Sequence, residues 1–407
     1  MGNEALKPLD SQDPAFIENP YTLYSELRES KPVALAGENF WVVTGREEMM
    51  AVLRDHDRFT SRRNLDGAFA FSPEARQILE EALFFRVALL NVEPPEHTRF
   101  RALINDAFTP RNLRMLEPSI RSLAAGLADG FAGDQKADLL RQFAYPLPMT
   151  VICDIMGIPA QDRAMVKQWN NAWLALQVLP LPPEQQVAFA GQVLEYMGYF
   201  RSLLEERKRR PGEDLLSRLT QAAQQPDPVC TDDDVLVSMR VLLAAGHETT
   251  TNLIANTALH LLWHHDLWDA AVRDQTLIPA AIEEGLRYDS SVQGTPRFAT
   301  EDICVGGTTI PAGAKVQAMV AAAGHDPEWV EDPDTFRLDR PAPARHHGFG
   351  YGIHFCPGAP LARLESRIAF ETLTRRFPGM TLEAGYQPSH MPGGFVFHGL
   401  TALPVTW

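Results

Sequence analysis

Apolar and polar positions along this chain recur mostly with the spacing of amphipathic or buried helices. The predicted helices are residues 20–29, 45–54, 95–108, 110–129, 139–156, 183–209, 232–264, 277–288 and 360–376. Shorter β-type segments are residues 32–36, 40–43, 302–310, 315–320 and 394–405. Helices therefore crowd the middle of the chain, and strands lie near both ends. This order predicts one mixed domain, mainly α, with a small sheet closed by both chain ends, rather than βαβ repeats.

The longest predicted helix has a polar centre. Thr231 is a plausible N-cap, and Asp232–Asp234 lie in the first turn, where the helix dipole favours carboxylates. Its middle reads Gly246-His-Glu-Thr-Thr-Thr251, although glycine and threonine are poor helix formers. Two interpretations are open. The glycine permits close packing and the threonines bond to preceding carbonyls, or the helix is distorted beside a cavity.

The composition excludes several classes of protein. The chain has 407 residues, with 37 Lys+Arg and 52 Asp+Glu, so its net charge is −15. That excess argues against binding to nucleic acid or to an anionic membrane surface. No apolar stretch approaches the roughly 20 residues of a membrane span, and the first twenty residues have no apolar core typical of a signal peptide. We therefore expect a cytoplasmic protein without membrane or nucleic-acid partners.

Cys356 has unusual surroundings. The four cysteines lie far apart, which is not typical of a disulfide framework. A lone cysteine is commonly a small buried apolar residue. Around Cys356, however, glycines at 350, 352 and 358 permit close approach of the backbone, and Pro360 fits the first turn of a following helix. A sulfur just before a helix N-terminus is favoured as thiolate, which makes it a candidate nucleophile or metal ligand.

These residues carry a resemblance to a known family. Phe349, Gly352, His354, Cys356 and Gly358 match the F-x-x-G-x-[HR]-x-C-x-G signature of the cytochrome P450 superfamily. Glu284 and Arg287 match its E-x-x-R motif, and residues 246–250 match its oxygen-side helix. Residues 93–101, 296–297, 310–313 and 403–407 resemble the soluble, ferredoxin-dependent bacterial members. The matches follow the family's order over nearly the whole chain.

The resemblance implies a fold and a cofactor. The expected fold is the P450 triangular prism, a single haem domain over residues 1–407, with haem b (iron protoporphyrin IX) between the long central helix and the helix after the cysteine loop. Cys356 would bind the haem iron. His97, Arg101, Arg297 and His354 would bind the propionates, since arginine suits carboxylates.

The resemblance also assigns roles beyond cofactor binding. Glu284 and Arg287 would form a buried ion pair that supports the cysteine loop, although residues three apart on a helix can equally form a weak exposed pair. Glu248 and Thr249 would be the acid–alcohol pair that delivers protons to bound oxygen. The expected substrate pocket is mostly apolar, and some of its candidates could instead pack in the core: Phe84, Phe85, Val87, Leu242, Ala245, Val292, Gln293, Thr295, Phe395 and Val396.

The implied function is that of a haem-thiolate monooxygenase. It would insert one oxygen atom of O₂ into an apolar or aromatic small molecule, in secondary metabolism. Electrons would come from NAD(P)H through a separate ferredoxin reductase and ferredoxin, and the protein would be a monomer. Two alternatives are kept open: a haem-thiolate enzyme of oxidative coupling or peroxide-driven oxidation, and a non-catalytic haem-binding protein, which would not need Glu248 and Thr249.

Overall fold

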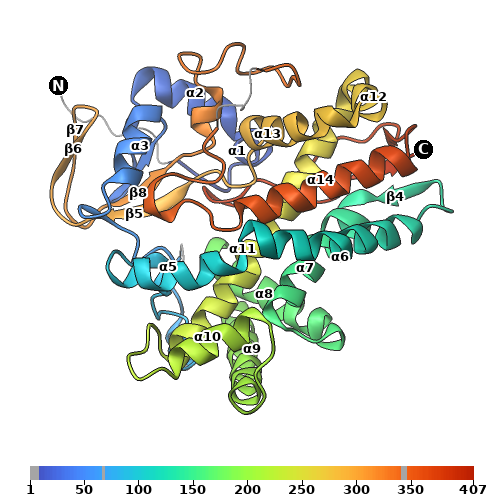
Figure 1. Cartoon of the computed structure of the whole chain (residues 1–407). Helices are drawn as coiled ribbons and strands as arrows, with labels where there is room; N and C mark the ends of the chain where they lie inside the picture. The colour runs from blue at the N-terminus through green and yellow to red at the C-terminus, as the bar shows by residue number, and fades with distance from the viewer. Residues whose placement is uncertain (1–8, 67–68, 341–345) are drawn as a thin grey trace. The chain divides into compact units, whose positions relative to one another are not determined.

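The computed structural model describes residues 9–66, 69–340 and 346–407. The chain is mainly helical with a smaller β part (Figure 1), as its sequence predicts. The α-helices are α1 (Pro14–Glu18), α2 (Pro20–Ser30), α3 (Arg46–Arg54), α4 (Pro73–Glu81), α5 (Glu96–Ala107), α6 (Pro110–Asp129), α7 (Pro146–Met156), α8 (Arg163–Val178), α9 (Pro183–Arg209), α10 (Leu215–Ala223), α11 (Asp232–Trp263), α12 (His265–Arg273), α13 (Ile278–Tyr288) and α14 (Ala359–Arg376). The strands are β1 (Val33–Gly37), β2 (Phe40–Val43), β3 (Phe59–Thr60), β4 (Lys136–Asp138), β5 (Thr295–Ala299), β6 (Ile303–Val305), β7 (Thr308–Ile310), β8 (Lys315–Ala318), β9 (Thr381–Leu382) and β10 (Pro404–Thr406).

Nine of the described helices lie where the sequence predicts them. Helices α1, α4, α8, α10 and α12 and strands β3, β4, β5 and β9 have no counterpart among the predicted segments. The prediction of β structure over 394–405 is wrong for most of its length, because β10 begins only at Pro404. The apolar residues before it lie in turns that pack against other segments, so their apolar character reflects burial rather than sheet pairing.

The largest sheet joins segments far apart in the chain. Its strand order is β1-β2-β8-β5-β3, so strands before residue 61 pair with strands after residue 294. Strands β5 and β8 pair antiparallel with Arg297 opposite Val316. The C-terminal strand β10 lies between β4 and β9 in a second sheet. Both ends of the chain therefore contribute to the β part, as predicted.

The backbone packing divides the chain into two compact units. The first unit contains residues 1–60, 110–148 and 248–407, and the second contains residues 61–109 and 149–247. Helix α11 belongs to both, since the boundary falls between His247 and Glu248. The single domain expected over residues 1–407 stays a prediction.

Each unit has its own helix packing. In the first unit α14 lies along α6 and also packs against α13 (Figure 1). An apolar core cluster of the same unit includes Trp41, Met49 and Val316. In the second unit α9 packs against α4, α8 and α10. None of the helices in the described ranges is both long enough and apolar enough to cross a membrane.

Helix α11 begins at the predicted cap and runs without a break. The Thr231 hydroxyl accepts a bond from the Asp234 N–H at 3.3 Å, and the Asp234 carboxylate accepts one from the Thr231 N–H at 2.8 Å. This reciprocal arrangement satisfies free N–H groups at the helix start. At Gly246 an added Cβ would lie 2.6 Å from Ile152 of α7. The close-packing interpretation of Gly246 thus holds within the second unit.

Candidate active site

Cys356 lies in a tight turn that leads into α14. Its N–H donates to the Phe349 carbonyl at 2.9 Å, and its own carbonyl accepts from the Ala359 N–H at 3.4 Å. Gly350 and Gly352 have φ of 76°, a backbone region that favours glycine. A Cβ at Gly352 would also lie 2.6 Å from the Leu53 carbonyl oxygen. These contacts hold the turn in one shape and present the half-buried Cys356 just before the helix N-terminus.

Charged and aromatic groups support this turn from α13 and α14. Arg363 donates to both carboxylate oxygens of Glu283 at 2.6 and 2.8 Å, and His346 lies 3.0 Å from the same carboxylate. Burial alone would raise the pKa of Glu283, but the hydrogen bonds from Arg363 and His346 lower it to about 2. The Arg363 guanidinium also lies 4.5 Å from the ring centroid of Phe349. The hydrogen bond to Glu283 raises the pKa of Arg363, and the charge of Cys356 adds to that shift.

The other cysteines differ from Cys356. Cys153 and Cys230 are buried, and burial raises the pKa of each thiol to about 12, so both stay protonated at neutral pH. Cys304 is exposed in β6. Cys356 is the cysteine whose surroundings suit a thiolate ligand.

Glu284 and Arg287 form a buried ion pair in the structure. Arg287 donates to both Glu284 oxygens at 2.7 and 2.8 Å, and the two side chains are 0 and 1% exposed. Arg287 also donates to the carbonyls of Gly324 and Pro333, both at 2.7 Å. The pair therefore anchors the 324–335 segment to α13.

The sequence did not indicate a third member of this cluster. Arg340 donates to both oxygens of Glu284 at 2.9 and 3.0 Å. It also bonds the carbonyls of Asp332 and Thr335 at 2.8 and 2.6 Å. Because Arg340 is 56 residues from Glu284 in the chain, no local spacing relates the two.

Glu248 and Thr249 lie at the middle of α11 on its less buried side. Both are half-buried and Ala245 is exposed, whereas most other residues between 242 and 262 are buried. The acid and the alcohol are thus adjacent on this helix, close to Ala245.

The four predicted propionate ligands divide between the two units. Arg297, in β5, is 3% exposed, and its guanidinium donates to the Thr295 hydroxyl at 3.2 Å and the Pro296 carbonyl at 2.7 Å. His354 is half-buried two residues before Cys356. In the second unit, both remaining candidates lie on α5, where His97 is buried and Arg101 donates to Asn105 at 2.8 Å.

The pocket candidates differ in how the structure uses them. Phe85, Val87 and Val396 are half-buried, and Leu242 and Phe84 are buried. Among the candidates of the first unit, several side chains or backbones already have structural contacts. Gln293 donates to Tyr21 and to the Ser290 carbonyl, Thr295 accepts from Arg297, Phe395 packs on Phe16 and Phe40, and Val292 pairs with Phe397.

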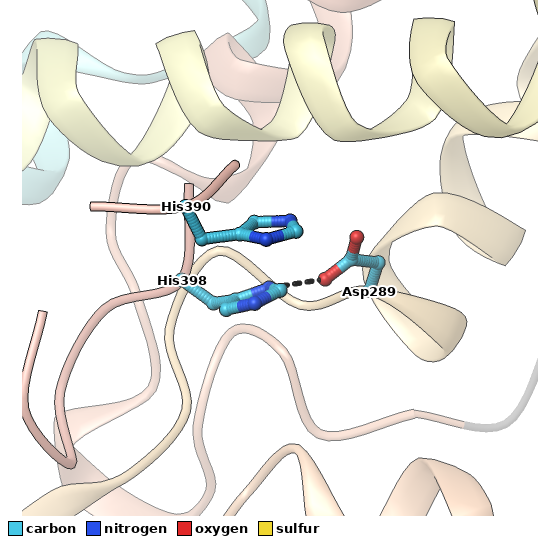
Figure 2. A group of neighbouring side chains, drawn as sticks. All are labelled: Asp289, His390 and His398. Atoms are coloured by element: carbon cyan, nitrogen blue, oxygen red, sulfur yellow. Dashed lines mark hydrogen bonds and ion pairs between the residues drawn. The ribbon is translucent and has the colours of Figure 1, made fainter. Parts of the chain in front are cut away.

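A second polar cluster, absent from the sequence predictions, surrounds Asp289 at the end of α13. Asp289 is 4% exposed, and its two oxygens lie 2.7 Å from His398 Nδ1 and 2.9 Å from His260 Nε2. His390 stacks on His398 with ring centroids 4.1 Å apart (Figure 2). The His390 Nδ1 also lies 2.8 Å from a Glu18 carboxylate oxygen. Asp289, His390 and His398 bring possible ligand atoms within 4.8 Å of one another. The nearly parallel rings and the short Asp289–His398 bond are typical of a hydrogen-bonded cluster rather than of ligands that converge on an ion.

Comparison with known proteins agrees with this arrangement. The family model for cytochrome P450 matches residues 21–401. The chain is 38% identical over 406 residues to cytochrome P450 monooxygenase PikC of Streptomyces venezuelae, covering 96% of this chain and 92% of that protein. It is 33% identical to the polyketide biosynthesis cytochrome P450 PksS of Bacillus subtilis (strain 168), covering 96% of each. A solved structure of cytochrome P450 CREJ with (4-ethylphenyl) dihydrogen phosphate has a TM-score of 0.91 at 32% identity and covers 100% of both chains.

These matches define a haem-thiolate oxidoreductase. The chain belongs to the cytochrome P450 family, it is a monooxygenase of that family, and its cofactor is haem b. The described residues fit that cofactor, because the Cys356 turn offers a single half-buried thiol as ligand, just before the N-terminus of α14. The buried guanidinium of Arg297 adds a cation suited to a carboxylate.

Proposed function

We propose that this protein inserts one oxygen atom of O₂ into a C–H or C=C bond of an apolar or aromatic small molecule in natural-product biosynthesis. The observation that carries the proposal is the Cys356 turn at the start of α14, combined with an acid–alcohol pair at the open middle of α11. The relative named for polyketide biosynthesis supports the substrate class.

Five residues would hold the cofactor. Cys356 would bind the iron as a thiolate, and His97, Arg101, Arg297 and His354 would donate to the propionates. When bound, haem b supplies the iron at which O₂ is activated. Arg297 is held in place by Thr295 and by its own strand, so little side-chain entropy remains to be lost when it binds a carboxylate.

Glu248 and Thr249 would deliver protons to the oxygen. The Thr249 hydroxyl both donates and accepts, so it can pass a proton onward and receive another. The Glu248 carboxyl would supply that second proton from solvent, since a carboxyl beside a hydroxyl can act as a general acid. This role favours O₂ over peroxide as the oxidant, because peroxide already carries the protons. A non-catalytic haem protein would need neither residue.

Electrons would come from NAD(P)H through a separate ferredoxin reductase and ferredoxin. Of the arginines near the Cys356 turn, Arg363 is occupied by Glu283, and Arg367 lies between Glu117 and Glu371. Arg111 and Arg114 are exposed on α6, and neither has an ion pair among residues 9–66, 69–340 and 346–407. We infer that these two arginines attract an acidic ferredoxin, with a rate that falls as salt increases. A cytoplasmic monomer stays a prediction.

The pocket would be mainly apolar, with segment 84–90 and the side of α11 near Ala245 as its walls. An apolar lining with few polar anchors favours a medium-sized molecule oriented by one or two hydrogen bonds. We expect Phe85, Val87, Leu242 and Ala245 to contribute contacts. Gln293 and Phe395 instead have structural partners, so truncating them is expected to affect stability more than selectivity.

The test is a compound screen followed by turnover. A library is added to the ferric protein and the spin-state change in the haem spectrum is measured; compounds that bind are then incubated with NAD(P)H and a surrogate ferredoxin system. Oxygenated product containing ¹⁸O from ¹⁸O₂ supports the proposal. Binding without product under any electron supply would favour the non-catalytic alternative, and product formed only with peroxide would favour the peroxide-driven one.

The proton-delivery role has its own prediction. Thr249→Ala is expected to bind substrate and consume NAD(P)H but release peroxide or water instead of product. A lost general acid commonly costs about 10²–10⁴-fold in rate, so Glu248→Gln should lower kcat within that range and change its solvent isotope effect. Thr251→Ala, on the same helix, is the control. If Thr249→Ala and Glu248→Gln both converted all consumed NAD(P)H into product, the proton-delivery role would be contradicted.

A further inference from the structure

Arg240 is a buried arginine within α11 of the second unit. Its side chain is 0% exposed. Within the described ranges, no carboxylate lies within 4.0 Å of its guanidinium. Burial lowers the pKa of Arg240 to about 10, which leaves it charged at neutral pH. A charge removed from water is costly unless polar groups compensate it, so its surroundings need an explanation.

The compensation comes from the end of α4. The guanidinium donates to the carbonyls of Ala82, Leu83 and Phe84, each at 3.4 Å. Its Cζ also lies 5.4 Å from the ring centroid of Trp173 and 5.8 Å from that of Phe84. The last carbonyls of a helix have no partners within it and carry the negative end of the dipole. Arg240 therefore caps α4 from another helix.

The capped turn has an unfavourable backbone conformation. Leu83 has φ of 53°, although it is not a glycine. The Phe84 N–H donates back to the Leu79 carbonyl at 2.9 Å, which is the bond that closes a helix through a left-handed residue. That position usually holds glycine, because a side chain there is strained. Such strain persists only where surrounding contacts enforce it.

The segment after this turn is one of the proposed pocket walls. Phe84 and Phe85 pack edge to face at 5.1 Å, and both contact Phe71. Arg86 donates to Asp234 at 2.9 and 3.1 Å. Segment 82–86 is thus tied to α11 at two points, Arg240 and Asp234, and Leu242 lies two residues after the first.

We propose that Arg240 is a positioning residue that enforces the strained turn at Leu83 and thereby fixes the wall formed by residues 84–90, which sets the size of substrate the pocket accepts. The inference rests on the proposed function, in which this segment lines the pocket. Arg240 itself has no surface open to a ligand, so it acts through the turn.

The first test measures the turn directly, without turnover. Arg240→Met, Arg240→Lys and Leu83→Gly are prepared as haem-loaded proteins, and amide hydrogen exchange is followed in peptides covering 82–92. We expect exchange there to be roughly tenfold faster or more in Arg240→Met, since the segment opens locally more often. Arg240→Lys should restore part of the protection, because lysine keeps the charge but offers fewer donors. Leu83→Gly should relieve the strain and leave protection at least as high as in the wild type.

Arg207→Met is the matched control. Arg207 is a half-buried arginine of the second unit, and it donates to Asp214 at 2.9 Å and to the Gly157 carbonyl at 3.0 Å. Its loss should lower the thermal midpoint but leave exchange over 82–92 as in the wild type. If both substitutions accelerated exchange in that segment equally, Arg240 would contribute only to the overall stability of the fold, and the proposal would be overturned.

The second test measures pocket size. Imidazoles that carry alkyl or aryl groups of increasing bulk are titrated into the ferric protein, and their binding is measured by the shift of the haem absorption band. Arg240→Met should bind unsubstituted imidazole as the wild type does, but change its relative affinity for the bulkiest compounds by about tenfold, which corresponds to 1.4 kcal/mol. If Arg240→Met kept the size selectivity of the wild type, the proposal would be overturned. It would also be overturned if amide exchange over 82–92 were unchanged and the variant lost affinity only for anionic compounds. Failure of the wild type to form product would contradict the proposed function and leave the exchange result standing.

Discussion

Pro357, next to the thiolate candidate, bears directly on the electronic properties of the site. Hydrogen bonds from backbone N–H groups to a ligand sulfur withdraw charge and raise the reduction potential of the metal. Proline has no N–H, so one such donor is missing in this turn. The Gly358 backbone lies near the sulfur, since a Cβ there would be 3.8 Å from Sγ. Pro357 can alternatively act only by stiffening the turn.

Pro357→Leu decides between these roles. If the missing donor matters, the variant should have a higher ferric/ferrous potential than the wild type at the same ligation and spin state. Spectroelectrochemical titration provides the measurement, and Pro360→Ala in the first turn of α14 controls for stiffness. A potential that is unchanged or lower in Pro357→Leu would leave only the stiffening role.

The identity of the ligand is tested at the same scale. Cys356→Ala is expected to lose the strongly red-shifted Soret band that a thiolate ligand gives the ferrous carbon-monoxide complex. Cys304→Ala removes an exposed cysteine and should keep the band. An unchanged spectrum in Cys356→Ala would mean that another residue binds the iron.

Among the secondary-structure elements, α13 has the strongest polar contacts. Glu284 lies between Arg287 and Arg340, so its loss leaves two guanidiniums near one another in a buried place. Breaking a buried pair by removing one partner commonly costs about 3–5 kcal/mol. Glu284→Gln should therefore lower the free energy of unfolding by this amount and reduce haem retention.

Urea unfolding followed by haem absorbance and by circular dichroism measures both effects. Asp339→Asn breaks a solvent-screened pair with Arg337 and should change stability far less than Glu284→Gln does. If Glu284→Gln were as mild as Asp339→Asn, the cluster would not support the cysteine loop. The E-x-x-R spacing indicates the pair, but only the folded 324–340 segment brings Arg340 to it.

At the scale of the whole molecule, the Asp289 cluster joins distant parts of the chain. It connects the ends of α11 and α13 with the C-terminal loop through His260 and His398, and it reaches the N-terminal region through Tyr21 and Glu18. Burial alone would raise the pKa of Asp289, but His398 and His260 hold it well below its usual range. Burial would likewise lower the pKa of His398, but Asp289 raises it.

These shifts predict a loss of stability at alkaline pH. Because the pKa of folded His398 is raised, its contribution is complete below the unfolded value of about 6.5 and is lost as the pH rises through the folded value. The contribution of Asp289 is present above about pH 3.9 and is lost only well below it. Burial and the charge on His398 lower the pKa of His390. The stacked His390 ring therefore stays neutral at neutral and alkaline pH, and it does not reverse the loss of stability.

The measurement is the free energy of unfolding between about pH 6 and 9. His398→Gln and Asp289→Asn should both be less stable than the wild type near pH 6. In both variants the free energy of unfolding should fall less steeply toward pH 9 than it does in the wild type. His264→Gln alters an exposed histidine outside the cluster and should keep the wild-type slope. If His398→Gln left the wild-type slope unchanged, the decline in stability would not come from His398, and the prediction would be contradicted.

The sequence by itself determined the long helices, the cysteine turn and the family. Local signals do this, since capping residues, positive-φ glycines and an i, i+3 charge pair act over a few residues. Helices α1, α4, α8, α10 and α12 were missed because much of a helix's stability comes from packing of its apolar face, which only the folded chain defines. Only the tertiary structure decided which polar groups meet across long separations, such as Arg340 with Glu284, His398 with Asp289, and Arg240 with the end of α4. Buried charges must find partners wherever the fold brings them, and no spacing in the sequence encodes that distance.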